Sequence, residues 1–186
     1  MKIGYALTGS FCTVRRSLSV LNTLIENYEI VPIVSEAISR TDTRFGKAED
    51  TLMALTDVCG SSPIRLITEA EPLGPKTPLD AMVICPCTGN TLAKLACGIT
   101  DSTVTMAAKA HLRQDRPLVI AISTNDALSQ NLKNLATLLQ RKSVYIVPFG
   151  QDDPINKPHS LISDFSLTEK TLSLALQGKQ LQPLLI

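Results

Sequence analysis

The sequence has almost no net charge, because 18 Lys and Arg residues stand against 17 Asp and Glu residues and leave a formal charge of +1. Nucleic acids and anionic membrane surfaces attract an excess of basic side chains, and that excess is absent here. The apolar run that follows Met1 and Lys2 ends at Leu7, far too short for a secretory signal or a membrane-spanning helix. We therefore expect a cytoplasmic protein that binds neither nucleic acid nor membrane.

Residues that could form disulfides, metal sites or catalytic pairs are also few. The cysteines number five, an odd count without a Cys-x-x-Cys motif, and there are two histidines. This pattern indicates neither a disulfide framework nor a zinc site, so we expect reduced thiols and no bound metal. His111 falls on a predicted helix and His159 in a late loop, which gives no support for a Ser-His or Cys-His pair. Any chemistry would therefore be carried by a cofactor.

The sequence does contain short buried runs that alternate with helical patterns over 186 residues, enough for one well-buried domain. The apolar runs predict strands at 2–8, 29–34, 64–67, 81–85, 117–122 and 144–147. Helical periodicity predicts helices that include 14–25, 47–58, 92–96, 104–113, 127–140 and 167–176. Segments 68–79 and 148–159 are rich in Pro and Gly and are predicted to be surface loops.

This alternation is typical of an α/β fold in three layers, with helices on both faces of a parallel sheet, as in Rossmann-like and flavodoxin-like proteins. No internal repeat is present, so we expect a single domain over residues 1–186. In the common strand order 3-2-1-4-5 the order reverses between the first and fourth strands, and ligands bind beyond the carboxyl ends of the strands there. That order would bring together the turns at 8–12, 86–91 and 123–126, with Ser35 beside them.

The turn after the first strand offers a cradle for one phosphate. Gly9 lets the backbone approach closely, Ser10 and Thr13 supply hydroxyl groups, and a helix starting near Thr13 directs its free N–H groups at an anion. The spacing of Gly4 and Gly9 differs from the dinucleotide-binding glycine motif, and no Gly-Lys-Ser/Thr follows, so a mononucleotide fits better than a pyrophosphate. The alternative is that Gly9 and Ser10 are only turn and cap residues.

The stretch from Asp80 to Ala110 joins a buried run through the polar turn 86–90 to another helix. The free N–H groups at the start of this helix could bind a ligand that carries oxygens. The alternative is an ordinary turn in which Asn90 or Thr91 caps the helix. Asp101 and Asp126 are single acidic residues, and we interpret both as helix caps.

The residues from Pro86 to Asp101 resemble a motif of the flavoprotein family that holds phosphopantothenoylcysteine decarboxylase, lantibiotic-precursor decarboxylases and flavin prenyltransferases. The family's Pro-Ala-Ser-Ala-Asn-Thr corresponds to Pro86-Cys87-Thr88-Gly89-Asn90-Thr91. The resemblance implies a site for FMN at the converging turns. The candidate cofactor contacts are Thr8, Gly9, Ser10, Phe11, Cys12, Ser35, Pro86, Cys87, Thr88, Gly89, Thr91 and Ser123.

Within this set the resemblance implies that Gly9 and Ser10 hold the phosphate and that backbone groups of Thr88 and Gly89 line the isoalloxazine ring. Asn90 matches the family's substrate-contacting Asn, and Asn125 stands where the decarboxylases have their substrate-clamp Asn, so both are candidate catalytic residues. Cys12 and Cys87 fall in the same expected pocket. Because no base lies beside them in the sequence, we expect them to serve as packing residues.

Four further segments, 41–46, 71–76, 121–128 and 147–154, resemble the B subunits of bacterial dipicolinate synthases. This resemblance implies an oxidoreductase subunit that takes part in oxidising dihydrodipicolinate to pyridine-2,6-dicarboxylate during sporulation, in the mother-cell cytoplasm. It also implies a partner, the A subunit of dipicolinate synthase, which would carry the NAD(P). Arg44 and Lys76 are candidate contacts for the carboxylates of this small diacid, and Arg44 offers a bidentate fork. The alternative is that both are solvated surface cations.

Two departures separate the chain from the decarboxylases, because residues 60–80 contain no His and no cysteine follows Cys97. An FMN-dependent decarboxylase or prenyltransferase of the same family is one alternative, and a non-catalytic partner of the A subunit is another. The apolar tail 184–186 and the segment 148–158 are expected to meet another protein chain, which predicts a homo-oligomer in addition.

Overall fold

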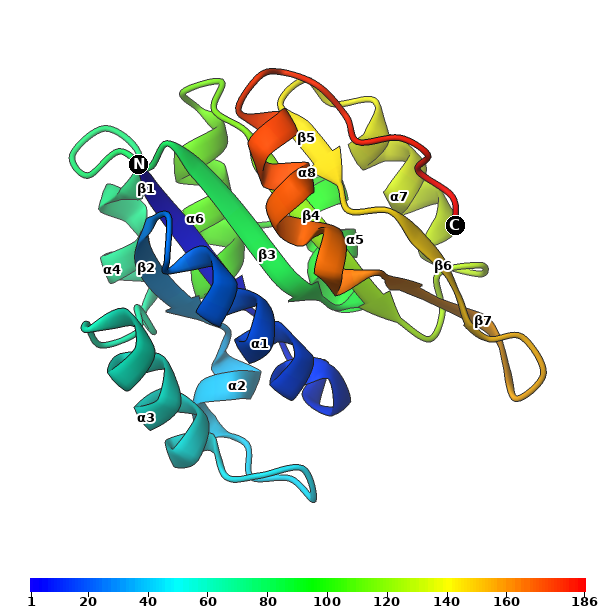
Figure 1. Ribbon diagram of the computed structural model, residues 1–186, viewed down its shortest axis with the longest axis horizontal. Coiled ribbons are helices and arrows are strands. Elements are labelled where there is room, and N and C mark those ends of the chain that lie inside the picture. The colour runs from blue at the N-terminus through cyan, green and yellow to red at the C-terminus, as the bar shows by residue number, and fades with distance from the viewer.

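A seven-stranded mixed sheet forms the centre of the computed structural model, which describes residues 1–186. The strand order is β2-β1-β3-β4-β7-β6, and β5 also pairs with β4. β1 to β5 run parallel, whereas β7 is antiparallel to both β4 and β6. The strands are β1 (Lys2–Leu7), β2 (Glu29–Val34), β3 (Ala81–Cys87), β4 (Leu118–Thr124), β5 (Val144–Ile146), β6 (Phe149–Asp153) and β7 (Lys157–Ser163) (Figure 1).

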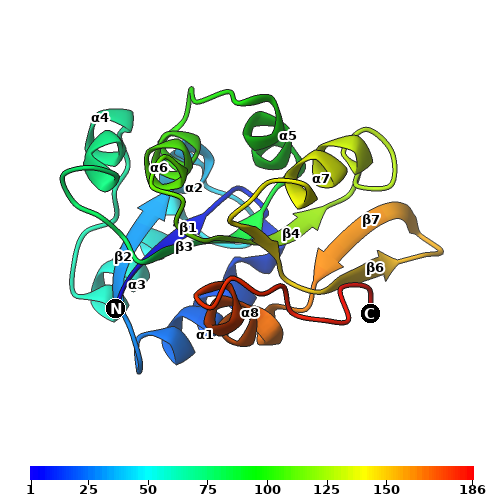
Figure 2. The same cartoon turned by 90° about the horizontal axis from the view of Figure 1, so that it is seen from above.

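Helices cover both faces of the sheet, as the sequence pattern predicts (Figure 2). The longer helices are α1 (Val14–Leu24), α3 (Ala48–Cys59), α5 (Gly89–Cys97), α6 (Thr103–Leu112), α7 (Leu132–Leu139) and α8 (Thr168–Ala175). The short ones are η1 (Phe11–Thr13), α2 (Glu36–Arg40), α4 (Ile67–Ala70), η2 (Glu71–Leu73) and η3 (Phe165–Leu167). The three-layer α/β architecture is confirmed.

The buried residues divide between the two faces with the period of two that a strand imposes. In β3, Met82 and Ile84 join the core formed with α4, α5, α6 and α7. Ala81, Val83 and Cys85 join the core formed with α1, α3 and α8. Because β3 is buried on both faces, it is a continuous apolar run in the sequence rather than an alternating one.

The predicted reversal of strand order is present between β1 and β3. β1 pairs with β2 on one side and with β3 on the other, so the chain leaves β2, crosses over the sheet and returns beside β1. The third predicted strand is reduced to one parallel bridge between Ile33 and Ile64. The strand does not continue beyond Ile64, because the N–H groups of Arg65 and Leu66 donate to the Glu69 carboxylate. These bonds stabilise the start of α4 at Ile67.

Three sequence predictions are corrected by the structure, two of them because of long-range pairing. Segment 68–79 contains α4 and η2 rather than only a loop, and segment 148–159 is largely the β6–β7 hairpin. This hairpin forms because β7 pairs with the end of β4 at Ser123 and Thr124. α7 begins at Leu132 and not at Ala127, because the N–H of Leu128 donates to the His159 carbonyl in β7 and the turn that follows closes on Asp126.

The carboxyl-terminal tail adds to the edge of β6. The N–H of Phe149 donates to the Leu184 carbonyl at 3.0 Å, and the N–H of Ile186 donates to the Phe149 carbonyl at 3.1 Å. The tail backbone is therefore partnered within the chain, whereas the Leu185 side chain remains 71% exposed. No helix in the structure has the length and apolar character needed to cross a membrane.

Ser17 links α1 to two strands, and this link gives a stability prediction. Its buried hydroxyl donates to the Cys85 carbonyl in β3 and lies 2.8 Å from the Tyr5 hydroxyl in β1. Replacing Ser17 by Ala leaves a buried carbonyl short of a partner, so we expect Ser17→Ala to lower the free energy of unfolding by about 1–3 kcal/mol in urea denaturation. Ser19→Ala, on the exposed face of the same helix, should change it by less than about 0.5 kcal/mol.

His111 gives a second prediction, because its ring is buried with Nε2 2.9 Å from the Pro117 carbonyl and Nδ1 without a partner. Burial lowers the pKa of this imidazole below its ordinary value of 6.5, and nearby Arg116 adds to the effect. At a pH between the pKa of His111 in the folded chain and its ordinary value of 6.5, the unfolded chain binds more protons than the folded one. The free energy of unfolding should therefore fall as the pH drops below 6.5. His111→Gln should remove that part of the pH dependence in thermal melts, and His159→Gln should keep it. An unchanged profile for His111→Gln would contradict this account.

Candidate functional site

A cavity of about 610 Å³ lies at the carboxyl edge of the sheet, where the strand order reverses. We call it the switch-point cavity. Its walls come from the turns after β1, β3 and β4 and from the β6–β7 hairpin. It is lined by Gly9, Ser10, Cys12, Thr13, Arg16, Thr88, Gly89, Asn90, Ser123, Thr124, Asn125, Asp126, Asp152, Lys157, Ser160 and Ile162. The three turns that the sequence predicts to converge, 8–12, 86–91 and 123–126, therefore contribute to one cavity, whereas Ser35 does not line it.

Thr8 fixes the first two of these turns relative to each other. Its hydroxyl donates to the Pro86 carbonyl at 2.7 Å and accepts the N–H of Thr88 at 2.9 Å. The Thr8 side chain is 1% exposed, so both of its bonds are shielded from water. Because the hydroxyl is fully used inside the chain, Thr8 positions the two turns rather than facing the cavity, and its predicted contact with a cofactor is not supported.

Three hydroxyl groups meet at the start of η1. Ser10 Oγ lies 2.9 Å from Ser123 Oγ, and Thr13 Oγ1 lies 3.0 Å from Ser10 Oγ. Ser10 and Ser123 share one hydrogen bond but carry two hydroxyl protons, so one proton has no acceptor in the chain. Together with the free N–H groups of the first helical turn, this arrangement can donate hydrogen bonds to an anionic oxygen.

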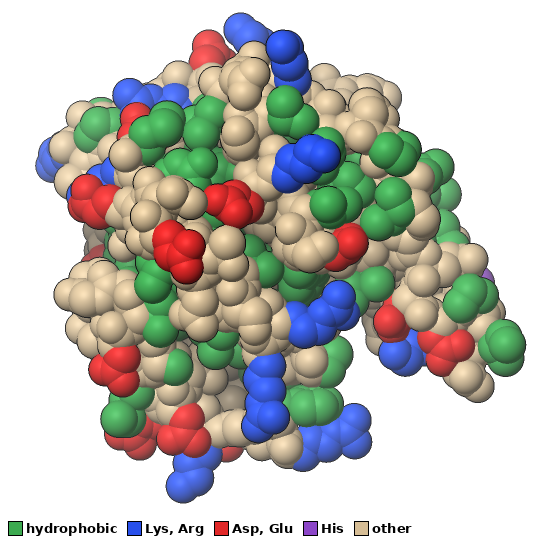
Figure 3. All heavy atoms as spheres, in the orientation of Figure 1, with side chains coloured by type: hydrophobic (Ala, Val, Ile, Leu, Met, Phe, Trp, Pro, Cys, Tyr) green, Lys and Arg blue, Asp and Glu red, His purple; other side chains and the backbone are tan.

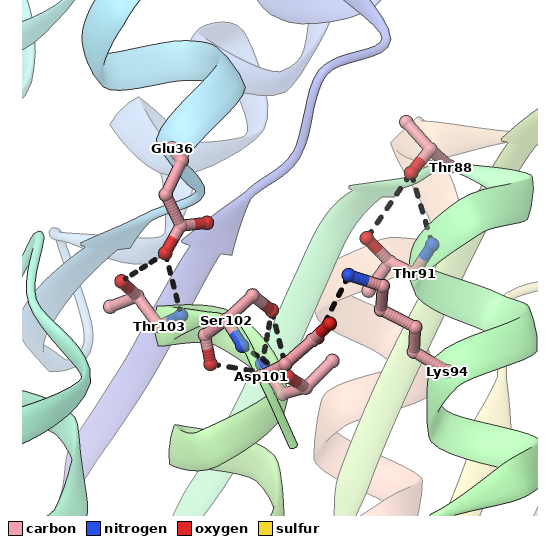
Figure 4. A network of polar contacts seen from close by, with 8 residues as sticks. Glu36, Thr88, Thr91, Lys94, Asp101, Ser102 and Thr103 are labelled. Carbon is pink, nitrogen blue, oxygen red and sulfur yellow. Dashed lines mark hydrogen bonds and ion pairs between the residues drawn. The ribbon is translucent and has the colours of Figure 1, made fainter. Parts of the chain in front are cut away.

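The helix α5 starts at the opposite wall, and its cap differs from the predicted one. Thr88, not Asn90 or Thr91, is the N-cap: its hydroxyl accepts the N–H of Thr91 at 3.3 Å and contacts the Thr91 hydroxyl at 3.1 Å (Figure 4). Asn90 is therefore released from capping. Its exposed amide makes no hydrogen bond within the chain, and the same holds for Asn125. Both amides are free to contact a ligand in the cavity.

The Asp126 carboxylate lies against the start of α5. Asp126 is therefore not the cap of a following helix, as the sequence analysis interpreted it. Asp126 accepts from the Thr124 hydroxyl and from the Asn131 amide, the latter at 2.9 Å. A Cβ atom on Gly89 would stand 2.6 Å from the Asp126 carboxylate, so only glycine allows this approach. The positive end of the α5 dipole favours the negative charge at this place.

The other predicted cap, Asp101, forms an ion pair instead. Its carboxylate lies 2.8 Å from Lys94 Nζ, whose hydrogen bond lowers the pKa of Asp101 (Figure 4). Ser102 is the N-cap of α6, and Glu36 accepts both the N–H and the hydroxyl of Thr103. These contacts join the segment after α5 to α2, so they hold the helices behind the cavity rather than the cavity itself.

The hairpin supplies the outer wall, including a charged pair that sequence reasoning missed. Lys157 Nζ lies 2.6 Å from the Asp152 carboxylate, which raises the pKa of Lys157. The Ser160 hydroxyl donates to the Thr124 carbonyl at 3.2 Å and joins this wall to β4. The prolines in this segment led to the prediction of a loop instead of a hairpin. Pro154 lies in the turn and Pro158 at the outer end of β7, where β7 does not pair with β4 and needs no N–H group for that pairing.

Other predicted site residues lie elsewhere. Ser35 caps α2 by accepting the N–H of Ile38, and it does not line the cavity. Lys76 lies four residues before Asp80, whose N–H donates to the Lys2 carbonyl at the start of β1. It is therefore at the amino edge of the sheet, opposite the cavity, and a contact with a ligand there is not supported within one chain.

The remaining predictions divide between packing and a neighbouring cavity. Pro86, Cys87 and Thr91 are buried behind the turn, and burial raises the pKa of the Cys87 thiol well above its usual range. Phe11 and Arg44 line a second cavity of about 450 Å³, which shares Cys12 with the first. Cys12 is exposed between the two cavities, so the expectation that it serves as a packing residue is wrong. The ligand contacts proposed for Gly9, Ser10, Cys12, Thr88, Gly89, Asn90, Ser123 and Asn125 agree with this geometry and stay predictions.

Comparison with known proteins gives matches along the whole chain. The dipicolinate synthase B subunit of Bacillus subtilis (strain 168) is 46% identical over 186 residues, which are 100% of this chain and 93% of that protein. The crystal structure of the dipicolinate synthase B subunit from Bacillus halodurans C is 42% identical, has a TM-score of 0.91 and matches 100% of this chain and 95% of that chain.

More distant structures share the fold over most of its length. A dodecameric FMN-dependent UbiX-like decarboxylase from Escherichia coli O157:H7 is 26% identical, with a TM-score of 0.65 and 80% of each chain covered. The Flavoprotein family model matches residues 1–168. The chain therefore belongs to the Flavoprotein family and is a close homologue of the dipicolinate synthase B subunit.

Proposed function

We propose that this chain binds FMN in the switch-point cavity and acts as the B subunit of a dipicolinate synthase. In this role it takes part in oxidising dihydrodipicolinate to pyridine-2,6-dicarboxylate, together with an A subunit that carries the NAD(P). The observation that carries the proposal is the 46% identity over the full chain to the Bacillus subtilis protein. Relatives with the same fold are FMN-dependent enzymes, which supports a flavin rather than another mononucleotide.

The residues of the cavity fit a flavin phosphate. Ser10, Thr13 and Ser123 present hydroxyl groups, one proton of which is unpartnered, and Arg16 lines the same cavity. A Cβ atom on Gly9 would stand 3.0 Å from the Ala37 side chain, so glycine lets this turn pack closely against α2. The bulky Phe11 does not obstruct this cradle, because its ring lines the second cavity instead.

The rest of the cavity fits the ribityl chain and one edge of the ring. Backbone groups of Thr88 and Gly89 and the side chain of Ile162 would line it, and the Asp126 carboxylate favours a hydrogen-bond donor at that end. A bound flavin supplies the capacity to accept a hydride. Aromatisation of the dihydropyridine ring loses one hydride and one proton, and the chain's part is to orient the ring and neutralise its carboxylates.

Asn90 and Asn125 are proposed to orient the dihydropyridine ring through hydrogen bonds inside the switch-point cavity. Each carries an amide that is free of partners in the chain, and each comes from a different turn of the cavity. A neutral amide can both donate and accept hydrogen bonds, so the two side chains can fix the orientation of the ring without adding charge to the cavity. A cysteine decarboxylase of the same family is less well supported, because no cysteine follows Cys97.

A homo-oligomer and a contact with the A subunit remain part of the proposal. An apolar groove of about 460 Å³ runs between the outer face of α7, β6 and the tail, with Leu132, Leu139, Leu185 and Ile186 exposed. Exposed apolar patches of this kind mark protein contacts. A dodecameric relative with the same fold supports assembly.

The proposal predicts that Ser10→Asp weakens flavin binding, because it places a carboxylate where the phosphate would lie. We expect the dissociation constant for FMN, measured by quenching of flavin fluorescence, to rise by more than about tenfold. Ser19→Asp adds the same charge on the exposed face of α1 and should bind FMN as the wild type does. If the wild-type chain fails to bind FMN, both alone and with the A subunit present, the flavin part of the proposal is wrong.

A further inference from the structure

The second cavity lies beside the switch-point cavity and is formed by residues other than those of the flavin cradle. We call it the Arg44 cavity. It occupies about 450 Å³ between the start of α1 and the segment that joins α2 to α3, within the volume range of small-molecule sites. Cys12 lines both cavities, so a ligand in one would lie next to a ligand in the other.

The rim of the Arg44 cavity carries positively charged side chains that have no ion-pair partner within the chain. Arg15, Arg44 and Lys47 line it, and none of the three side chains forms a hydrogen bond or an ion pair within the chain. Asp50 is the single acidic residue in the lining, so the cavity carries an excess of two positive charges. Figure 3 shows Lys and Arg side chains gathered over this end of the molecule, near the start of α1.

The floor of the cavity is apolar. Val14 and Ile38 are buried beneath it, and Phe11 and Leu18 are partly buried against the same core. At the rim the Arg44 guanidinium lies 4.8 Å from the centroid of the Phe45 ring, which is 46% exposed. Stacking on Phe45 holds the planar guanidinium in place at low entropic cost, so its fork is ready for a carboxylate.

An apolar floor with unpaired cations at its rim suits an anion that has a flat hydrocarbon body. A phosphate ester or a sugar acid would make no apolar contact with the floor, and a neutral ring would form no ion pair with the cations. Arg44 can bind one carboxylate bidentately, and Lys47, three residues further along the chain, can meet another as a point charge.

We propose that the Arg44 cavity binds a small planar aromatic diacid, with Arg44 and Lys47 holding its carboxylates. The identity of the diacid as the substrate or product of the oxidation rests on the proposed function. The site itself does not, because it is formed by residues other than those of the flavin cradle. Lys76, which the sequence offered together with Arg44, has no part in it.

The test is calorimetric titration of the full chain with pyridine-2,6-dicarboxylate, in buffer stripped of metal ions because the diacid chelates them. We expect saturable binding that weakens at least about tenfold in the Arg44→Ala, Lys47→Ala double variant. Arg44→Lys, which keeps the charge but loses the fork, should fall between the two. Arg40→Ala removes an exposed cation that lines neither cavity and should bind as the wild type does.

Two further titrations distinguish binding in the Arg44 cavity from binding in the switch-point cavity. Pyridine-2-carboxylate, which has one carboxylate, should bind at least about tenfold more weakly than the diacid. Ser10→Asp should retain diacid binding, because it changes only the flavin cradle. The inference is overturned if the wild type does not bind the diacid with or without FMN, if the double variant binds it unchanged, or if Ser10→Asp abolishes binding while the double variant keeps it. Loss of FMN binding alone would count against the proposed function and leave the Arg44 cavity standing.

Discussion

The hydroxyl group of Thr8 is the contact on which the site depends. It donates to the Pro86 carbonyl and accepts the N–H of Thr88, so one buried side chain joins the carboxyl ends of β1 and β3. Those two strands are neighbours in the sheet but distant in the sequence, and the chain leaves them in opposite directions. The turn that carries Ser10 and the turn that begins α5 are held face to face as a result. A cavity forms between them because neither turn can fold back over the other.

The layers of the fold could be predicted from the sequence because they rest on local patterns. β3 and β4 are buried on both faces and are therefore continuous apolar runs in the sequence. The common strand order predicted the reversal between the first and fourth predicted strands, which are β1 and β3 of the structure. The β6–β7 hairpin could not be predicted, because β7 has exposed residues at its outer half and gains its stability from pairing with the end of β4. The start of α7 depends on the same hairpin through the bond from Leu128 to His159.

The site divides in the same way. Residues on turns that directly follow buried strands, such as Ser10, Asn90 and Asn125, were predicted to converge, and they line one cavity. Lys76 lies at the other edge because η2 and the following turn return the chain to the amino end of β3 before the strand begins. The pair formed by Asp152 and Lys157 had no signal in the sequence, since its place depends on a hairpin that only tertiary pairing creates.

Hydrogen–deuterium exchange of the full chain with and without FMN tests most directly whether a flavin lies at the reversal of strand order, beside a cavity for a diacid. It reports the place of binding without reference to activity. We expect slower exchange at residues 9–13, 88–91 and 123–126, which form the switch-point cavity. Unchanged exchange in these turns, or protection confined to residues 41–51 of the Arg44 cavity, would contradict the account.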